Sequence, residues 1–480
     1  ISCYDGRLNK TPSIDRLAAG GVRFERSFCT NSICAPARAV LLTGKYSHRN
    51  GVVDNAVRFD GSQTTFPKLL RQAGYRTALF GKWHLKTDPT GFDFWSILPD
   101  QGDYYNPDFI TNGVRSTRRG YVTDLVTDDA LAWLRVRDKA KPFCVLLHHK
   151  APHRNWLPDA KHIGLYEGEI RPVPDTFYDD YATRSDAART QEMRIAEHMT
   201  MGYDLKLSPD DTPADDTPEE ARLRKEWEGN LARMTPEERE MFTRAYAKDN
   251  EAFRKAGLKG RELAEWKYQR YIRDYLRCIA SVDDNVGKVL DYLEAEGLAD
   301  DTIVIYTSDQ GFYLGEHGWF DKRFMYEESL RMPLVVRYPR EIAPSVNRRD
   351  MVLNLDYAPT FLDYAGLDAP AEMQGRSMRS VWRGKTPRDW RQSIYYHYFE
   401  YPAVHSVKRH FGVRTDRYKL IHFYYDIDAW EMYDLEKDPR ELRNVYADPD
   451  YAATRREMTA ELDRLRTLYG DTDEARFLPQ

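Results

Sequence analysis

The chain has 480 residues, which is enough to bury the core of a large α/β domain with a smaller unit appended to it. Its 71 basic and 76 acidic residues give a net charge of −5, so the overall charge gives no reason to expect a nucleic-acid partner, and an anionic substrate must be attracted locally. No stretch approaches the roughly 18 consecutive apolar residues of a membrane helix, and we therefore expect no membrane span.

Helices and strands alternate over most of the chain, beginning with a helix over residues 11–19 that ends at two glycines. The predicted strands cover residues 22–24, 77–80, 143–147, 302–307 and 334–336. Most of these runs are unbroken and apolar, a pattern typical of strands that helices cover on both faces. We therefore predict an α/β fold for residues 1–373, with a large, mostly parallel sheet flanked by helices.

Two segments depart from this alternation. Residues from about 176 to 275 are strongly charged and helical, with a capping box at 235–238, and we interpret them as an insertion. From about residue 374 alternating aromatic strands replace the apolar runs, and a charged helix near 450–469 follows them. We predict a small antiparallel α+β subdomain over residues 374–480.

The most informative motif is C-A-P-A-R at residues 34–38, followed by L-L-T-G-K at 41–45. A lone cysteine is more often a small buried apolar residue than a nucleophile. Here Pro36 suits the first turn of a helix, which places Cys34 at a helix N-terminus. Free backbone N–H groups and the positive end of the helix dipole would then face an anion.

Polar side chains follow the predicted strands at the points where they end. In chain order these clusters contain Lys82 and His84; His148, His149, Lys150 and His153; Ser308, Asp309 and Gln310; and, shortly afterwards, Asp321 and Lys322. Any one cluster is unremarkable, because a single Lys or His at a strand end is usually a surface residue. Since ligands bind at the carboxyl ends of the strands in open α/β sheets, we expect the four clusters to converge on one site.

The C-x-P-x-R and L-T-G-K motifs resemble the formylglycine signature of the type I sulfatases, in the alkaline phosphatase superfamily. The resemblance covers nearly the whole chain, and a C-terminal stretch at 430–444 resembles a further signature of that family. The motifs most similar to the N-acetylglucosamine-6-O-sulfatase branch, which acts on heparan-type glycosaminoglycans, lie at residues 81–84, 101–107, 151–153, 308–311, 321–327 and 401–405. The resemblance implies an alkaline-phosphatase-like fold.

The resemblance also implies a role for each strand-end residue. Cys34 would be oxidised to formylglycine by a formylglycine-generating or an anaerobic maturation enzyme, and its hydrate would attack sulfur. Hard oxygen donors suit calcium, so one Ca²⁺ would be held by residue 34, Asp309 and Gln310. The remaining catalytic assignments are Lys82 and Lys322 for the sulfate oxygens, Arg38 for orienting the hydrate, His153 as general acid, and His84 as the base that expels sulfate.

In the family, two further metal carboxylates come from an Asp-Asp pair that ends a first strand, and that strand would precede Ile1. We expect such an N-terminal piece to carry a signal peptide as well, which predicts a periplasmic, secreted or lysosomal-type compartment. Gln310 stands where many relatives carry Asn or His, and its oxygen can still bind calcium.

The resemblance therefore implies a sulfuric ester hydrolase that removes the 6-O-sulfate from N-acetylglucosamine in heparan-type or heparin-type chains. Asp321 and His405 are the candidates for sugar hydroxyl contacts, with a role as structural surface residues as the alternative. Two other enzymes stay open: a sulfatase for another sugar position, and a phosphonate or phosphate monoester hydrolase. A non-catalytic glycan-binding protein that never matures Cys34 is the alternative from another class.

Overall fold

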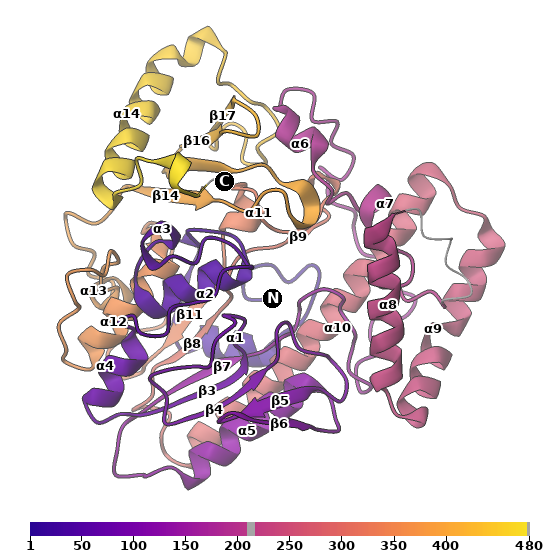
Figure 1. Ribbon diagram of the computed structural model, residues 1–480, viewed down its shortest axis with the longest axis horizontal. Helices are drawn as coiled ribbons and strands as arrows, with labels where there is room; N and C mark the ends of the chain where they lie inside the picture. Colours follow the sequence, from indigo (N-terminus) through magenta and orange to yellow (C-terminus); the bar gives the residue numbers. More distant parts are fainter. Residues whose placement is uncertain (209–216, 478–480) are drawn as a thin grey trace.

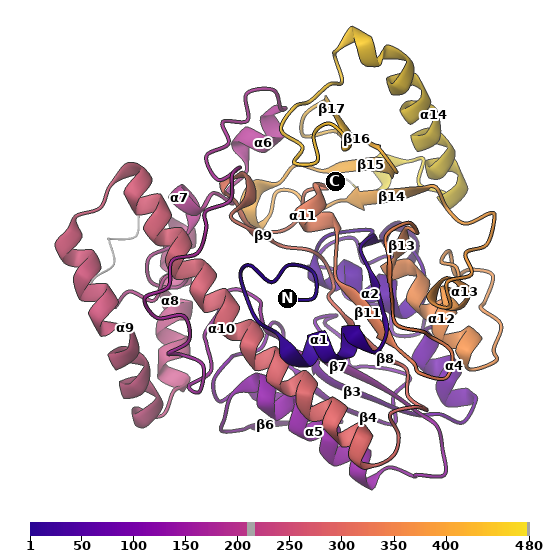
Figure 2. The ribbon, with the colours of Figure 1, turned by 180° about the vertical axis from the view of Figure 1, so that it is seen from behind.

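The computed structural model describes residues 1–208 and 217–477 (Figure 1). Layers of sheet and helix form the larger part of the molecule, and an antiparallel sheet covered by a helix forms the C-terminal part (Figures 1 and 2). The predicted α/β class with a small antiparallel C-terminal unit is therefore confirmed. Among the described residues, no helix is both long enough and apolar enough to cross a membrane.

The first sheet has five strands in the order β6-β5-β4-β3-β7. At its centre β3 (Arg76–Lys82) pairs in parallel with β4 (Phe94–Leu98) and with β7 (Phe143–His148). The strands β5 (Asp108–Thr111) and β6 (Val114–Thr117) extend it as an antiparallel hairpin. The parallel centre brings the ends of β3 and β7 to one edge of the sheet, as predicted.

A second sheet has four strands in the order β12-β1-β11-β8. In it β11 (Leu334–Arg337) pairs antiparallel with β8 (Val304–Thr307) and with β1 (Val22–Phe24), which pairs in parallel with β12 (Ser345–Asn347). The strands predicted for one large sheet thus lie in two mixed sheets. Their edge strands β7 and β8 line a cavity of about 1120 Å³.

Helices cover both sides of these sheets. On one side α10 (Gly260–Ala295) packs against α5 (Val122–Val136), as the view from behind shows (Figure 2). On the other side α2 (Cys34–Thr43) packs with α4 (Phe66–Gln72) and α12 (Tyr357–Tyr364) (Figure 1). The apolar side chains along α10 are core packing, since they contribute to the main hydrophobic clusters.

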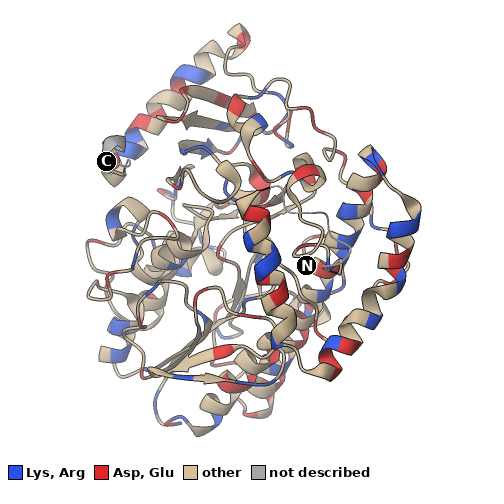
Figure 3. Cartoon of the chain, turned by 45° about the vertical axis from the view of Figure 1, so that its right-hand side comes forward, with Lys and Arg blue, Asp and Glu red and all other residues tan. Residues whose placement is uncertain are grey.

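The predicted insertion contains helices that project from the body of the molecule (Figure 1). The helices α8 (Pro218–Arg233) and α9 (Pro236–Ala256) lie side by side, and Thr235 and Glu238 form the predicted capping box of α9. Basic and acidic residues alternate along these helices (Figure 3). Residues 209–216 of the insertion lie outside the described residues.

The C-terminal unit is an antiparallel sheet in the order β14-β15-β16-β17. It runs from β14 (Ser393–Tyr398) through β15 (His410–Thr415) and β16 (Tyr418–Phe423) to β17 (Ala429–Asp434), and α14 (Ala452–Tyr469) packs on it. The proposed division at residues 373 and 374 stays a prediction, and residues 478–480 lie outside the described residues.

Candidate active site

Cys34 is the first residue of α2, at a helix start that is buried in the molecule. Ile33 precedes it in an extended conformation, and Cys34 is 1% exposed. The Ala35 N–H donates to Asn55 Oδ1 at 3.0 Å, which fixes the first turn. The predicted position at a helix N-terminus is confirmed. The Sγ atom of Cys34 stands where the oxygens of a formylglycine side chain would lie.

Two lysines and two histidines surround the Cys34 side chain. Lys82 Nζ lies 3.4 Å from Cys34 Sγ. Burial would raise the pKa of the Cys34 thiol, but the ammonium groups of Lys322 and Lys82, with hydrogen bonds from His153 and His84, hold that pKa well below its usual value. The pocket therefore favours a negative charge at residue 34.

Three separate parts of the fold contribute these four side chains, Lys82, His84, His153 and Lys322. Lys82 ends β3 and His84 follows it two residues later, with both side chains buried. His153 lies in the loop after β7, and Lys322 directly follows the short strand β10 (Phe320–Asp321). The structure thus brings together the strand-end residues that the sequence singled out, while their chemical roles stay predictions.

Arg38 joins the helix of Cys34 to the end of β8. Its Nε and Nη2 donate to Asp309 Oδ2 at 3.1 and 3.0 Å, and its Nη1 donates to the Lys82 carbonyl at 2.6 Å. These bonds occupy one carboxylate oxygen of Asp309. Arg38 therefore positions Asp309 and the end of β3. Its role in orienting the formylglycine hydrate stays a prediction.

Asp309 and Gln310 supply oxygen atoms of the kind that calcium prefers. Gln310 Oε1 is buried and has no hydrogen-bond partner among the residues that the structure describes, so it could bind a cation. Gly311 follows, and a Cβ at this position would lie 2.1 Å from the Glu328 carbonyl oxygen, so only glycine allows this close approach. The donors present fit calcium in kind, although no three His, Cys, Asp or Glu side chains within residues 1–208 and 217–477 are grouped to hold a metal.

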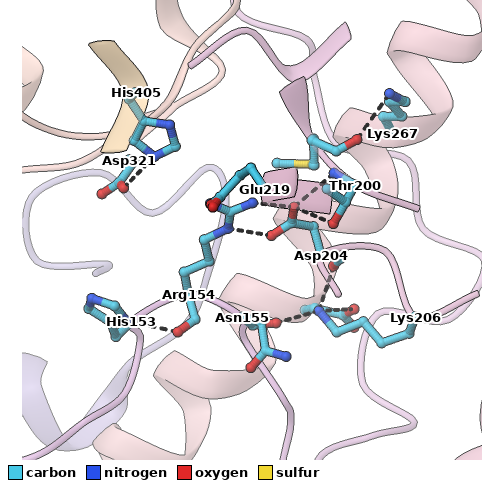
Figure 4. Close-up of polar contacts among 12 residues, drawn as sticks. His153, Arg154, Asn155, Thr200, Asp204, Lys206, Glu219, Lys267, Asp321 and His405 are labelled. Carbon is cyan, nitrogen blue, oxygen red and sulfur yellow. Dashed lines mark hydrogen bonds and ion pairs between the residues drawn. The ribbon is translucent and has the colours of Figure 1, made fainter. Parts of the chain in front are cut away.

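The two predicted sugar contacts, Asp321 and His405, lie together (Figure 4). Lys322 forms an ion pair with Asp321. His405 Nε2 is 2.8 Å from Asp321 Oδ2, and Lys322 Nζ is 2.8 Å from Asp321 Oδ1. Burial would raise the pKa of Asp321, but Lys322 and Arg323 hold it well below its usual value. Both Asp321 and His405 are buried, so the surface position in the alternative is wrong, while a sugar-binding role for the two stays a prediction.

Three residues near the site, Asp100, Gln101 and Lys150, had no role predicted from the sequence. His84 Nε2 lies 3.2 Å from Asp100 Oδ1 and 3.0 Å from Gln101 Nε2, so these two neighbours orient the imidazole. Lys150 is buried behind them, and burial with the charge of Lys82 lowers its pKa to about 8. Gln101 and Lys150 stood in segments that the sequence singled out, but nothing in the sequence linked them to His84.

The site and fold together define a hydrolase that acts on an anionic ester. A family model described as "Sulfatase" matches residues 1–367, and one described as "N-sulphoglucosamine sulphohydrolase, C-terminal" matches residues 315–468. The chain belongs to the sulfatase family, and it is a sulfuric ester hydrolase. The resemblance predicted from the sequence is therefore confirmed.

Several proteins with related sequences or structures are sulfatases of known specificity. The N-acetylglucosamine-6-O-sulfatase of Bacteroides thetaiotaomicron is 50% identical over 98% of this chain and 85% of its own length. The human N-acetylglucosamine-6-sulfatase is 27% identical over 82% of this chain and 63% of its own length. A solved structure of a protein in complex with its substrate D-glucosamine-2-N,6-O-disulfate superimposes with a TM-score of 0.94, at 50% identity over 99% of this chain and 96% of that one.

Proposed function

We propose that the protein removes the 6-O-sulfate from N-acetylglucosamine units of heparan-type glycosaminoglycans. The names of the two relatives and the substrate in the similar structure support this substrate class. The observation that carries the proposal is the 2.8 Å contact between Lys322 Nζ and Asp321 Oδ1. It supports a site in which the proposed sulfate-binding Lys322 lies beside the proposed sugar-binding pair, Asp321 and His405. A primary 6-O-sulfate projects from the ring and can reach Cys34 while the ring stays at Asp321 and His405.

We propose that the mature site contains formylglycine at position 34 and one calcium ion. A formylglycine-generating or an anaerobic maturation enzyme would oxidise Cys34. The hydrate would supply the attacking oxygen, and the ion would supply positive charge against the sulfate oxygens. Residue 34, the Asp309 carboxylate and Gln310 Oε1 are the donors of this chain that would hold the ion.

Lys82 and Lys322 bind the sulfate. A sulfate ester resists attack because its oxygens repel a nucleophile, and two ammonium groups reduce that repulsion. Both lysines already act on the Cys34 side chain, which supports a pocket arranged for an anion before the substrate binds. Arg38 holds Asp309 and the end of β3 in place while the sulfate is bound.

His153 protonates the departing sugar oxygen, and His84 accepts a proton from residue 34 as sulfate is released. Burial and the charges of Lys82 and Lys322 lower the pKa of His153 to about 3 in the free protein. A bound sulfate offsets the two lysine charges and therefore favours the protonated imidazole that a general acid requires. Asp100 and Gln101 orient His84 for the second step.

Because heparan-type chains lie outside the cytoplasm, we propose that the protein works in a periplasmic, secreted or lysosomal-type compartment. The experiment that tests the function is a comparison of sulfate release from 2-O-, 3-O-, 6-O- and N-sulfated glucosamines by the matured protein. We expect release from the 6-O-sulfate. Preference for any other position would overturn the assignment.

A further inference from the structure

Arg154 lies between the proposed sugar-binding pair, Asp321 and His405, and the helical insertion (Figure 4). Its Nε and Nη2 donate to Asp204 at 2.6 and 2.7 Å, and the Asp204 side chain is fully buried. The backbone N–H and the hydroxyl of Thr200 also donate to Asp204. The guanidinium lies 5.2 Å from the Phe320 ring and 5.4 Å from the Tyr203 ring. The side chain is therefore fixed from several sides.

The guanidinium of Arg154 lies within electrostatic reach of Asp321 and His405. Arg154 directly follows His153, whose Nδ1 lies 2.8 Å from the Arg154 carbonyl oxygen. Its charge acts on His405, and the charge of Asp321 acts on it. Nη1 makes no hydrogen bond with any described residue, and the side chain is 11% exposed. One donor group of a fixed arginine is thus available to a ligand.

The surrounding charges show which ligand this donor fits. Asp321 is already paired with Lys322 and Arg323, so it does not require Arg154 as a partner. Glu219, at the start of α8, is exposed and lies within electrostatic reach of both Arg154 and His405, so it only partly offsets the arginine charge. A guanidinium edge binds a sulfate-type or carboxylate oxyanion more strongly than a hydroxyl.

The geometry of the sugar points to one such oxyanion. In the proposed function the 6-O-sulfate lies at Lys82 and Lys322. Asp321 and His405 would then bind the ring hydroxyls that follow the 6-position. The next substituent along the ring is the one at C2. We infer that Arg154 is a substrate-binding residue that recognises an N-sulfonate group at C2 of the glucosamine unit. This inference rests on the proposed 6-O-sulfatase function.

The test compares two monosaccharides that differ only at C2: glucosamine 2-N,6-O-disulfate and N-acetylglucosamine 6-sulfate. We expect Arg154→Met, which keeps the apolar stem against Phe320 and Tyr203, to lower the ratio of kcat/KM for the disulfate over the N-acetyl sugar about tenfold. The matched control is Arg273→Met. Arg273 pairs with Asp249 at 2.7 Å between α9 and α10 and is 14% exposed, and its loss should leave the ratio at the wild-type value.

Because Arg154→Met leaves Asp204 buried without its partner, Arg154→Lys serves as the second variant. It keeps a cation for Asp204 but loses the second arm of the guanidinium, so the preference should fall in this variant too. Calorimetric binding of both sugars to the Cys34→Ala protein, with and without Arg154→Met, gives a readout that does not depend on turnover. We expect only the affinity for the disulfate to fall.

An unchanged ratio in both Arg154 variants, or an equal loss on both sugars, would overturn the inference and leave Arg154 as a structural partner of Asp204. Failure of the proposed function gives a different result, because the wild-type protein would then release no sulfate from N-acetylglucosamine 6-sulfate, whose single sulfate is at O6.

Discussion

Arg38 donates two hydrogen bonds to a single oxygen of Asp309, from Nε at 3.1 Å and from Nη2 at 3.0 Å. This pairing links the helix that carries Cys34 to the loop that carries the proposed calcium donors Asp309 and Gln310. It also leaves the second carboxylate oxygen of Asp309 available for a cation.

We expect Arg38→Lys to weaken calcium binding about 10- to 100-fold, because a lysine cannot make both bonds and Asp309 loses its fixed orientation. The measurement is a calorimetric calcium titration of the matured protein. Arg71→Lys, at a partly exposed pair with Asp93, is the control and should bind calcium as the wild type does. Wild-type calcium affinity in Arg38→Lys would show that Arg38 does not position a metal ligand.

Asp309→Ala removes a proposed calcium donor and should abolish measurable calcium binding, with activity lost in the same variant. Gln310→Asn keeps an amide oxygen at a shorter reach, so it should retain calcium with reduced affinity. The same titration measures both variants. Undiminished calcium binding by Asp309→Ala would place the ion elsewhere.

In the proposed mechanism His153 and His84 act at different stages, and two substrates separate their roles. A general acid is needed to expel a sugar alkoxide but not a nitrophenolate, which is a far better leaving group. We expect His153→Ala to lose about 10²- to 10⁴-fold in kcat on the 6-sulfated sugar and much less on nitrophenyl sulfate. His84→Ala should lose activity on both, because its step follows departure of the leaving group. Equal losses on both substrates for His153→Ala would contradict its assignment as the acid.

His317 makes the stability of the fold depend on pH. Burial would lower the pKa of His317, but a hydrogen bond with Asp179 and the nearby charge of Glu328 raise it from 6.5 to about 9. Because this pKa is raised in the folded protein, the protonated imidazole contributes stability fully below pH 6.5, and that contribution is lost as the pH rises through about 9.

We expect His317→Gln to be less stable than wild type at pH 6.5 and to lose less stability between pH 6.5 and pH 9. The slopes of the free energy of unfolding against pH should differ by up to about 1.4 kcal/mol per pH unit. Denaturant unfolding at several pH values measures it. His162→Gln, at a pair with Asp284 near the surface, is the control. Parallel pH profiles for His317→Gln and wild type would remove His317 as the cause.

The strand-end residues of the site could be predicted because each follows an apolar run at a known edge of a sheet. Lys82, His84 and Asp309 were found in this way. The contact of His84 with Asp100 and the pair of Arg154 with Asp204 could not be found, since each depends on how a loop or an insertion folds back onto the site.

The sequence pattern also could not predict whether neighbouring strands run parallel or antiparallel. An apolar run such as that of β11 indicates burial on both faces, whichever way the strand runs. In the structure β11 pairs antiparallel with β8, because the chain between them returns without a crossover helix long enough to span the sheet. The short strand β4 was missed, although it forms the parallel centre with β3.

The most direct test of the central claim is sulfate release from N-acetylglucosamine 6-sulfate by protein expressed with a maturation enzyme, compared with its Cys34→Ala variant. The mass of the peptide that carries residue 34 is measured in the same samples. The account predicts an aldehyde at residue 34 and sulfate release in the wild type, with neither in Cys34→Ala. Equal sulfate release by both proteins, or an active wild type whose Cys34 remains a thiol, would contradict it.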